Sequence, residues 1–162
     1  MGFNISGIVT NKNYKNDFLI LQQGLNMNLE FDGEISFQEA SLNWKEEGTC
    51  DIYFTDNTSI CFLNSKKCIE DVYEFENNDT LTFILSEYAM NFVLNYIENG
   101  NFKRSIMEVD GDRFIDEGEA LPEEGNESDI SELIWSKIDQ ILGRHFGSIK
   151  SDDIAYRYKI VI

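Results

Sequence analysis

Residues 91–118 read NFVLNYIENGNFKRSIMEVDGDRFIDEG and contain two signals for tight β-hairpin turns. Asn99-Gly100 and Asp110-Gly111 are dipeptides that favour two-residue hairpin turns, and the length of one strand separates them. We therefore predict three consecutive antiparallel strands. With two-residue turns, two apolar rows cross these strands on opposite faces: Phe92, Met107 and Phe114 in one row, and Val93, Ile106 and Ile115 in the other.

The same two turns also bring opposite charges together. They place Glu108 opposite Arg113 and Arg104 opposite Glu117, and cross-strand pairs of this kind are stabilising. Arg104 and Arg113 are therefore expected to form structural ion pairs. The apolar rows and the charge pairs follow from the same turns, so both patterns support one three-stranded meander.

Further strands are predicted on either side of this meander. Residues 50–54 and 59–63 form a hairpin with apolar side chains on both faces, so this hairpin should be central in the sheet or covered. Residues 81–86 and 154–161 alternate in the manner of two more strands. The polar segment 65–78 is interpreted as a loop with a weak strand.

Three helices are expected to accompany these strands. Asn16 can cap a short helix over residues 17–23. A second short helix starts at Ser36, which has the capping-box spacing to Glu39; Phe37, Ala40 and Trp44 share one face of it. A longer helix follows Asp129, because Ile and Leu recur there at helical intervals as far as Leu142.

These elements predict an α+β fold. We expect a mostly antiparallel sheet, a meander of about five to seven strands, with two short N-terminal helices and one longer C-terminal helix packed on it. The chain has 162 residues, including 12 Phe, 7 Tyr and 2 Trp, which is enough to build one substantial core. Residues 1–162 are expected to form a single domain with no linker and with an acidic loop at about 116–128.

The charge of the chain excludes one class of partner and is unevenly distributed. Thirty Asp and Glu against thirteen Lys and Arg give a formal net charge of −17, so we expect no nucleic-acid binding. Residues 108–132 contain eleven acidic residues and one basic residue, a net charge of −10. The acidity is therefore concentrated in about one sixth of the chain.

The sequence favours a cytoplasmic location. Residues 1–10 have the pattern of an opening strand and lack that of a secretory signal, and no apolar stretch approaches the ~20 residues that cross a bilayer, so no membrane contact is expected. The cysteines Cys50, Cys61 and Cys68 are odd in number and lack the spacing of a zinc site. Reduced thiols are the expectation.

No residue pattern predicts catalysis, a metal or a cofactor. His145 is the only histidine, and its place near the end of the last predicted helix favours an interaction with the helix dipole. The run from Asp110 to Asp112 resembles the start of a calcium loop, but Phe114, Ile115 and Leu121 stand where that loop needs a ligand, a glycine and a glutamate. We therefore expect no catalytic residue, no metal ligand and no cofactor, and the chain leans away from an enzyme.

One run of residues carries a resemblance to known proteins. Arg104, Glu108, Gly111 and the run GEALPEE at residues 118–124, followed by an amphipathic helix, resemble a pattern in small uncharacterised bacterial α+β proteins. Some of these are encoded beside polymorphic toxins and are presumed immunity proteins. The resemblance covers roughly the last third of the chain and transfers no catalytic residue. It implies a cytoplasmic protein that neutralises a basic toxin, such as a nuclease, by binding it.

The acidic segment has two interpretations, which the sequence leaves open. It is either a solvated loop that keeps the protein soluble or a landing site for a basic partner. For the second interpretation, the candidate contacts are the acids of the segment from Asp116 to Glu127: Asp116, Glu117, Glu119, Glu123, Glu124 and Glu127.

The leading hypothesis is a non-catalytic protein-binding module with a basic protein, such as a toxin, as its partner. One alternative is a small ligand-binding domain or an enzyme with a pocket between sheet and helices. Another is an acidic mimic of nucleic acid, which the concentration of charge in one segment disfavours. The oligomeric state is left open.

Overall fold

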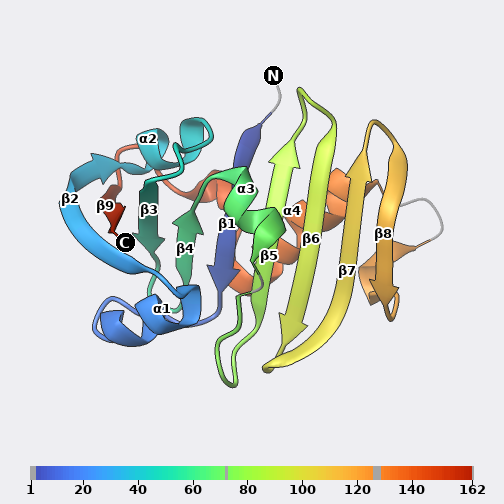
Figure 1. Cartoon of the computed structure of the whole chain (residues 1–162), viewed down its shortest axis with the longest axis horizontal. Helices are drawn as coiled ribbons and strands as arrows, with labels where there is room; N and C mark the ends of the chain where they lie inside the picture. Colours follow the sequence, from blue (N-terminus) through green and yellow to red (C-terminus); the bar gives the residue numbers. More distant parts are fainter. Residues whose placement is uncertain (1–2, 72, 126–128, 162) are drawn as a thin grey trace.

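The computed structural model describes residues 3–71, 73–125 and 129–161. It contains one open nine-stranded sheet in which all neighbouring strands are antiparallel, in the order β2-β9-β3-β4-β1-β5-β6-β7-β8 (Figure 1). The strands are β1 (Asn4–Thr10), β2 (Asn28–Ser36), β3 (Thr49–Phe54), β4 (Ser59–Phe62), β5 (Thr80–Ser86), β6 (Asn91–Glu98), β7 (Asn101–Val109), β8 (Asp112–Gly118) and β9 (Ile154–Val161). β2 and β8 are the two edges.

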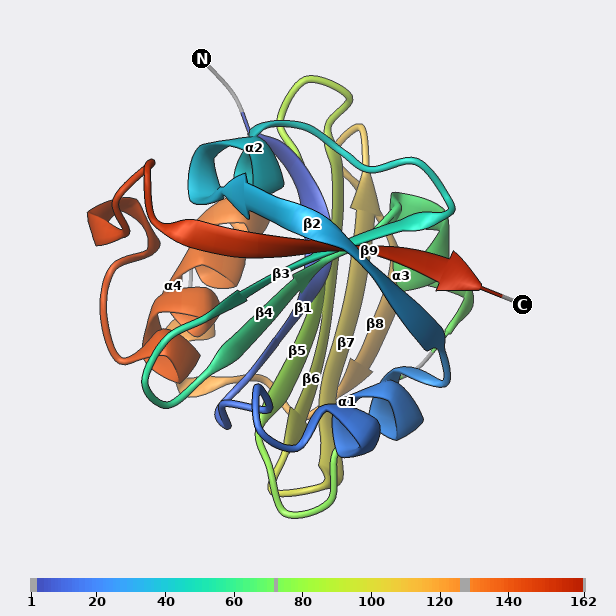
Figure 2. The same ribbon diagram turned by 90° about the vertical axis from the view of Figure 1, so that its left-hand side faces the viewer.

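Helices cover both faces of the twisted sheet (Figure 2). The helices are α1 (Phe18–Leu25), α2 (Phe37–Leu42), α3 (Ser65–Glu70) and α4 (Ile130–Leu142), with short 3-10 turns η1 (Pro122–Glu124) and η2 (Phe146–Ser148). α2 and α4 pack with one hydrophobic cluster, and α1 and α3 pack with the other. The sheet is therefore the middle layer between two separate cores.

The expected number of strands and helices is wrong. A meander of about five to seven strands with three helices is expected from the sequence, whereas the described residues form nine strands and four α-helices, and β9 and β1 are inserted out of sequence order. β2 was missed because it is an edge strand with few buried positions, held by pairing with the distant β9. α3 was missed because it is a short, polar helix in which only Cys68 is buried.

The hairpin of β3 and β4 has the predicted faces. Cys50, Ile52, Cys61 and Leu63 belong to the cluster under α1 and α3, while Tyr53, Ile60 and Phe62 belong to the cluster under α2 and α4. The hairpin is also central, between β9 and β1, as apolar residues on both faces require.

The helix ends agree with the sequence in part. The Glu39 N–H donates to Ser36 Oγ at 3.1 Å, and the Ser131 N–H donates to the Asp129 side chain, so these two predicted caps are confirmed. The first helix instead begins after Asp17, which makes no side-chain cap. α2 ends at Leu42, so Trp44 does not share its face and is 58% exposed.

The meander of β6, β7 and β8 has the two predicted turns. Asn99 and Gly100 have φ of 51° and 79°, and Asp110 and Gly111 have φ of 52° and 84°. Positive φ at both central residues is the requirement of the hairpin turn that these dipeptides favour.

The predicted registers beyond these turns are wrong because each hairpin contains a β-bulge. Tyr96 pairs with Arg104 and Ile97 with Phe102, which leaves Lys103 as the extra residue. In the next hairpin, the register shifts between Met107 and Glu108. One apolar row is consequently Val93, Met107 and Ile115.

The bulges also change the charge pairs. Glu108 still lies opposite Arg113, as predicted, but Arg104 lies opposite Gly118 and not Glu117. Gly118 has a φ of 91°, and a Cβ there would lie 2.1 Å from the carbonyl oxygen of Lys103. A glycine is therefore required where the chain leaves β8.

None of the helices in the described residues combines the length and the hydropathy that a membrane-spanning segment needs.

Candidate functional site

The strand β8 is an exposed edge of the sheet. All seven of its residues are exposed, and it pairs only with β7, so the backbone groups on its outer side have no partner strand. Phe114 is 68% exposed. An open strand edge of this kind is a template for contact with another chain unless charges protect it.

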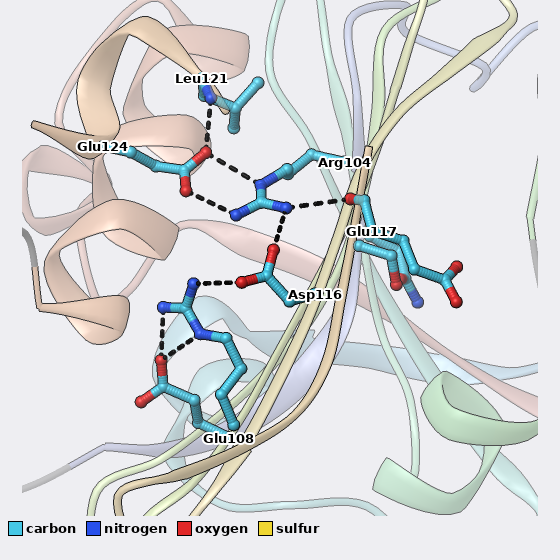
Figure 3. A network of polar contacts seen from close by, with 9 residues as sticks. Arg104, Glu108, Asp116, Glu117, Leu121 and Glu124 are labelled. Carbon is cyan, nitrogen blue, oxygen red and sulfur yellow. Dashed lines mark hydrogen bonds and ion pairs between the residues drawn. The ribbon is translucent and has the colours of Figure 1, made fainter. Parts of the chain in front are cut away.

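Arg104 organises the acidic residues on the inner side of this edge (Figure 3). Its guanidinium forms a fork with Glu124, with Nε–Oε2 and Nη2–Oε1 distances of 2.9 and 2.8 Å. Its Nη1 donates to Asp116 Oδ1 at 2.5 Å and to the carbonyl oxygen of Glu117 at 3.1 Å. Arg104 is only 4% exposed, so these contacts hold a buried charge.

The network continues to the other arginine of the meander. Arg113 binds Glu108 through Nη2 at 2.6 Å and Nε at 3.0 Å, and its Nη1 lies 3.3 Å from Asp116 Oδ2. Charges thus alternate from Glu124 through Arg104, Asp116 and Arg113 to Glu108. Asp116 and Glu124, two of the acidic residues predicted to contact a partner, are instead paired with arginines of this chain.

Glu123, a third predicted contact, is also paired within the chain. Lys137 of α4 places its Nζ 3.2 Å from Glu123 Oε1 and 4.4 Å from the centre of the Tyr96 ring. Gln140 donates to the same Glu123 oxygen at 2.5 Å. The segment after β8 is therefore attached to α4 by a lysine whose side chain is 6% exposed.

Four other acidic residues, from β8, the turn before it and its exit, take no part in these internal contacts through their carboxylates. Asp110, Asp112, Glu117 and Glu119 are exposed, and we call these four residues the acidic edge. Among the described residues, no lysine, arginine or histidine lies within ion-pair distance of their carboxylates. Of the six predicted contacts, Glu117 and Glu119 belong to this edge, and Glu127 lies outside the described residues.

The pKa values of the internal acids follow from these contacts. Burial raises the pKa of Glu124, but hydrogen bonds from Arg104 and the Leu121 N–H outweigh it, so the pKa lies below the ordinary value of 4.5. Hydrogen bonds from Arg104 and then Arg113 lower the pKa of Asp116. Both carboxylates are therefore ionised at neutral pH.

We expect the network to make the protein less stable in acid. A carboxyl whose pKa is lower in the folded state stabilises the protein above its unfolded pKa, and this contribution is lost as the pH falls through the folded value. Urea unfolding between pH 7 and pH 3 should show stability falling below about pH 4.5. Glu124→Gln should flatten this fall, whereas Glu70→Gln, at an exposed acid of α3, should not. Equal pH profiles for the wild type and Glu124→Gln would contradict this role of the network.

An apolar cleft lies on the other face of the same strands. It has a volume of about 420 Å³, and α3, the loop at Trp44 and the ends of β1 and β5–β7 form it. In Figure 1, α4 lies behind β5–β7, and no helix among the described residues lies over the front of β6–β8. A hollow of about 50 Å³ continues from the cleft to Ile115 of β8 and shares Ile69, Val93 and Met107 with it.

The histidine and the three cysteines are placed less favourably for catalysis than the acidic edge and the cleft are for binding. α4 ends at Leu142, so His145 is not in its last turn, and its Nδ1 lies 3.0 Å from Asp139 Oδ2 on an exposed surface. The thiols of Cys50, Cys61 and Cys68 are free and buried, and burial raises the pKa of Cys68 to about 12. The described residues contain no group of three or more His, Cys, Asp or Glu placed to hold a metal ion.

Comparisons with family models, with curated proteins and with solved structures found no match to this chain. The resemblance to immunity-like bacterial proteins therefore remains a prediction. The site is defined by its own geometry: an exposed edge strand, four outward acidic residues and an apolar cleft behind them.

Proposed function

We propose that this chain is a non-catalytic protein-binding module that takes a basic partner on its acidic edge. The observation that carries the proposal is the division of the acids around β8. Asp116, Glu123 and Glu124 are neutralised by internal cations, whereas the acidic edge has no internal counter-charge among the described residues. The inner acids hold the segment in place, and the outer acids attract the partner.

The physical basis of the attraction is electrostatic complementarity. Four carboxylates on one strand edge produce a local negative potential, which accelerates encounter with a basic surface and orients it. The open backbone of β8 can add hydrogen bonds to an extended segment of that partner. Pairing with a second copy of the same edge is disfavoured, because it would bring acidic residues together.

The most specific form of the proposal is the neutralisation of a basic toxin, such as a nuclease, in the bacterial cytoplasm. It rests on the resemblance of residues 104–124 to presumed immunity proteins. Coexpression with a toxin encoded beside its gene should restore growth, and a chain without the acidic edge should lose this protection.

The apolar cleft supports a second candidate function, the binding of a small apolar ligand. Its volume of about 420 Å³ is within the range of ligand pockets. Glu108 is the only acidic residue among the described residues of its lining, and it is bound by Arg113. The cleft thus supports binding better than catalysis.

We expect the charges of the acidic edge to dominate binding of a cationic probe. In the variant Asp112→Asn/Glu117→Gln/Glu119→Gln, the affinity for a fluorescent lysine decapeptide should fall about ten-fold, because each lost charge pair contributes about 0.5 kcal/mol. Fluorescence anisotropy at increasing salt concentration measures the affinity for the decapeptide, and the affinity of the wild type should decrease as the salt concentration rises.

The matched control removes the same charge elsewhere. Glu30→Gln/Glu34→Gln/Glu74→Gln changes three exposed acids, two of them on the opposite edge strand β2, and should keep wild-type affinity. If both triple variants lose the same affinity, the probe reads net charge alone and the acidic edge is not a site.

A further inference from the structure

We propose that the apolar cleft anchors an uncharged apolar side chain of the basic partner, flanked in the partner by lysine or arginine. This inference rests on the proposed function and names the chemistry of the partner segment. Four observations carry it: exposed apolar side chains gathered at one place, an interior without a free charge, an acidic rim and continuity with β8.

Large apolar side chains gather at this cleft. Trp44, Ile69 and Tyr88 are 58%, 55% and 72% exposed, and they come from the loop after α2, from α3 and from the turn after β5. Ile84 and Val93 also line the cleft and are buried. A grouped apolar surface of this kind marks a contact site, whereas single exposed apolar residues do not.

The interior of the cleft accepts neither an anion nor a cation. The described residues that line it include no lysine, arginine or histidine, so an anionic headgroup would find no counter-charge there. Among the described lining residues the one carboxylate is Glu108, whose charge is already paired with Arg113 at 2.6 Å, so a buried ammonium would find no unpaired charge of opposite sign. Burying an unpaired charge is costly, and the occupant of the interior is therefore uncharged.

The rim of the cleft, in contrast to its uncharged interior, carries acidic residues. Asp110 follows Val109 of the lining, and Glu87 lies between Ser86 and Tyr88 of the lining. The Asp110 N–H donates to the carbonyl oxygen of Met90 at 3.0 Å, which joins the acidic hairpin tip to the turn that carries Tyr88.

Two lysines also lie next to lining residues, and both are paired. Lys45 follows Trp44 and its Nζ lies 2.8 Å from the Asp51 carboxylate. Lys66 follows Ser65 of the lining, and its Nζ lies 3.6 Å from the Glu47 carboxylate. The rim therefore favours positive charges beside an apolar anchor. A second copy of this chain, with the same net charge of −17, fits less well.

The cleft and the acidic edge belong to one surface. The hollow that extends the cleft ends at Ile115 on β8, two residues from Glu117 of the acidic edge. A partner segment along β8 can thus place a side chain in the cleft while its basic residues meet the carboxylates. This arrangement, with an apolar anchor inside and charges outside, is typical of protein interfaces.

The test uses blocked pentapeptides that separate the anchor from the charges. One has a central tryptophan with two lysines on either side, the second has a central alanine between the same lysines, and the third has the tryptophan between glutamates. Binding to the full chain is followed by NMR chemical-shift titration. The tryptophan–lysine peptide should bind about ten-fold more tightly than the alanine–lysine peptide, and the glutamate peptide should not saturate.

Variants of the cleft identify the place of binding. Trp44→Ala/Tyr88→Ala should weaken the tryptophan–lysine peptide about ten-fold and leave the alanine–lysine peptide unchanged. Phe31→Ala/Leu19→Ala removes two comparably exposed apolar side chains elsewhere and should change neither peptide. All four side chains are exposed, and urea unfolding of each variant checks that the fold is retained.

The outcomes separate this inference from the proposed function. The acidic-edge variant should weaken both lysine peptides equally; if it does not, the proposed function fails. If the cleft variant weakens neither peptide, or weakens both equally, the anchor site is overturned while the acidic edge stands. If free indole binds the cleft as tightly as the tryptophan–lysine peptide, the site takes a small neutral ligand, and the inference of a protein anchor is overturned.

Discussion

Replacing Asp51 with asparagine is expected to lower the free energy of unfolding by about 3–5 kcal/mol. The Asp51 side chain is fully buried, and it receives Lys45 Nζ at 2.8 Å and Arg157 Nε and Nη2 at 2.9 Å each. Asparagine keeps the shape of the side chain but removes its charge. Two cations then share one site without a counter-charge. Lys45 cannot readily turn to solvent, because its side chain is only 7% exposed.

The position of Asp51 explains why its loss should affect the whole molecule. It lies on β3, opposite Arg157 of β9, and Lys45 belongs to the loop between α2 and β3. Lys45 Nζ also donates to the carbonyl oxygen of Glu39 in α2 at 2.9 Å. One carboxylate thus joins the strand β9 and the helix α2 to the centre of the sheet.

Urea unfolding followed by circular dichroism measures the effect of Asp51→Asn. Asp32→Asn is the control, because its pair with Lys159 is exposed and 3.7 Å long, and it should cost less than about 1 kcal/mol. Adding Lys45→Met to Asp51→Asn should recover part of the loss, since it removes one of the two unpaired cations. A loss below about 1 kcal/mol for Asp51→Asn, or no recovery in the double variant, would contradict a buried charge triad.

Replacing Arg104 with methionine is expected to lower the free energy of unfolding by about 3 kcal/mol. The substitution keeps apolar volume in the place of a side chain that is 5% exposed, but it leaves Glu124, 14% exposed, without its fork of donors. Asp116 is 53% exposed and can turn to water, so its share of the loss is small. The cost is therefore that of a largely buried carboxylate that has lost its two charged donors.

The same variant should loosen the segment after β8. The Glu124 carboxylate that Arg104 holds also accepts the N–H of Leu121 at 2.5 Å, so hydrogen exchange at Leu121 should accelerate in Arg104→Met. Lys66→Met is the control, because Lys66 and its partner Glu47 are 59% and 67% exposed, and it should cost less than about 1 kcal/mol. Equal losses for Arg104→Met and Lys66→Met would show that burial of Arg104 does not determine its contribution.

Local features of this chain could be predicted because they depend on neighbouring residues. Asn99-Gly100 and Asp110-Gly111 form their turns because asparagine, aspartate and glycine tolerate the positive φ that such turns need. Ser36 caps α2 because its hydroxyl is three residues from the Glu39 N–H that it accepts. In each case the interacting groups are only a few residues apart.

The registers could not be predicted because a bulge adds one residue without a clear signal. The bulge between Met107 and Glu108 moves Arg104 from Glu117 to Gly118, and the arginine then reaches Glu124, twenty residues further along the chain. The buried triad at Asp51 was missed for a related reason. The signal for the triad was Asp51 itself, a lone acid among apolar residues in a central strand. Its partner Arg157, however, is 106 residues away in the sequence.

The sequence by itself determined the turns, the hairpin that is apolar on both faces and the concentration of acid in residues 108–132. Only the tertiary structure decided which acids remain free. Three of the predicted contact residues, Asp116, Glu123 and Glu124, are paired with Arg104, Arg113 and Lys137, and only then is the acidic edge distinct from the internal network. The physical reason is range: a turn depends on the conformation of two residues, whereas an ion pair depends on where two strands and a helix meet.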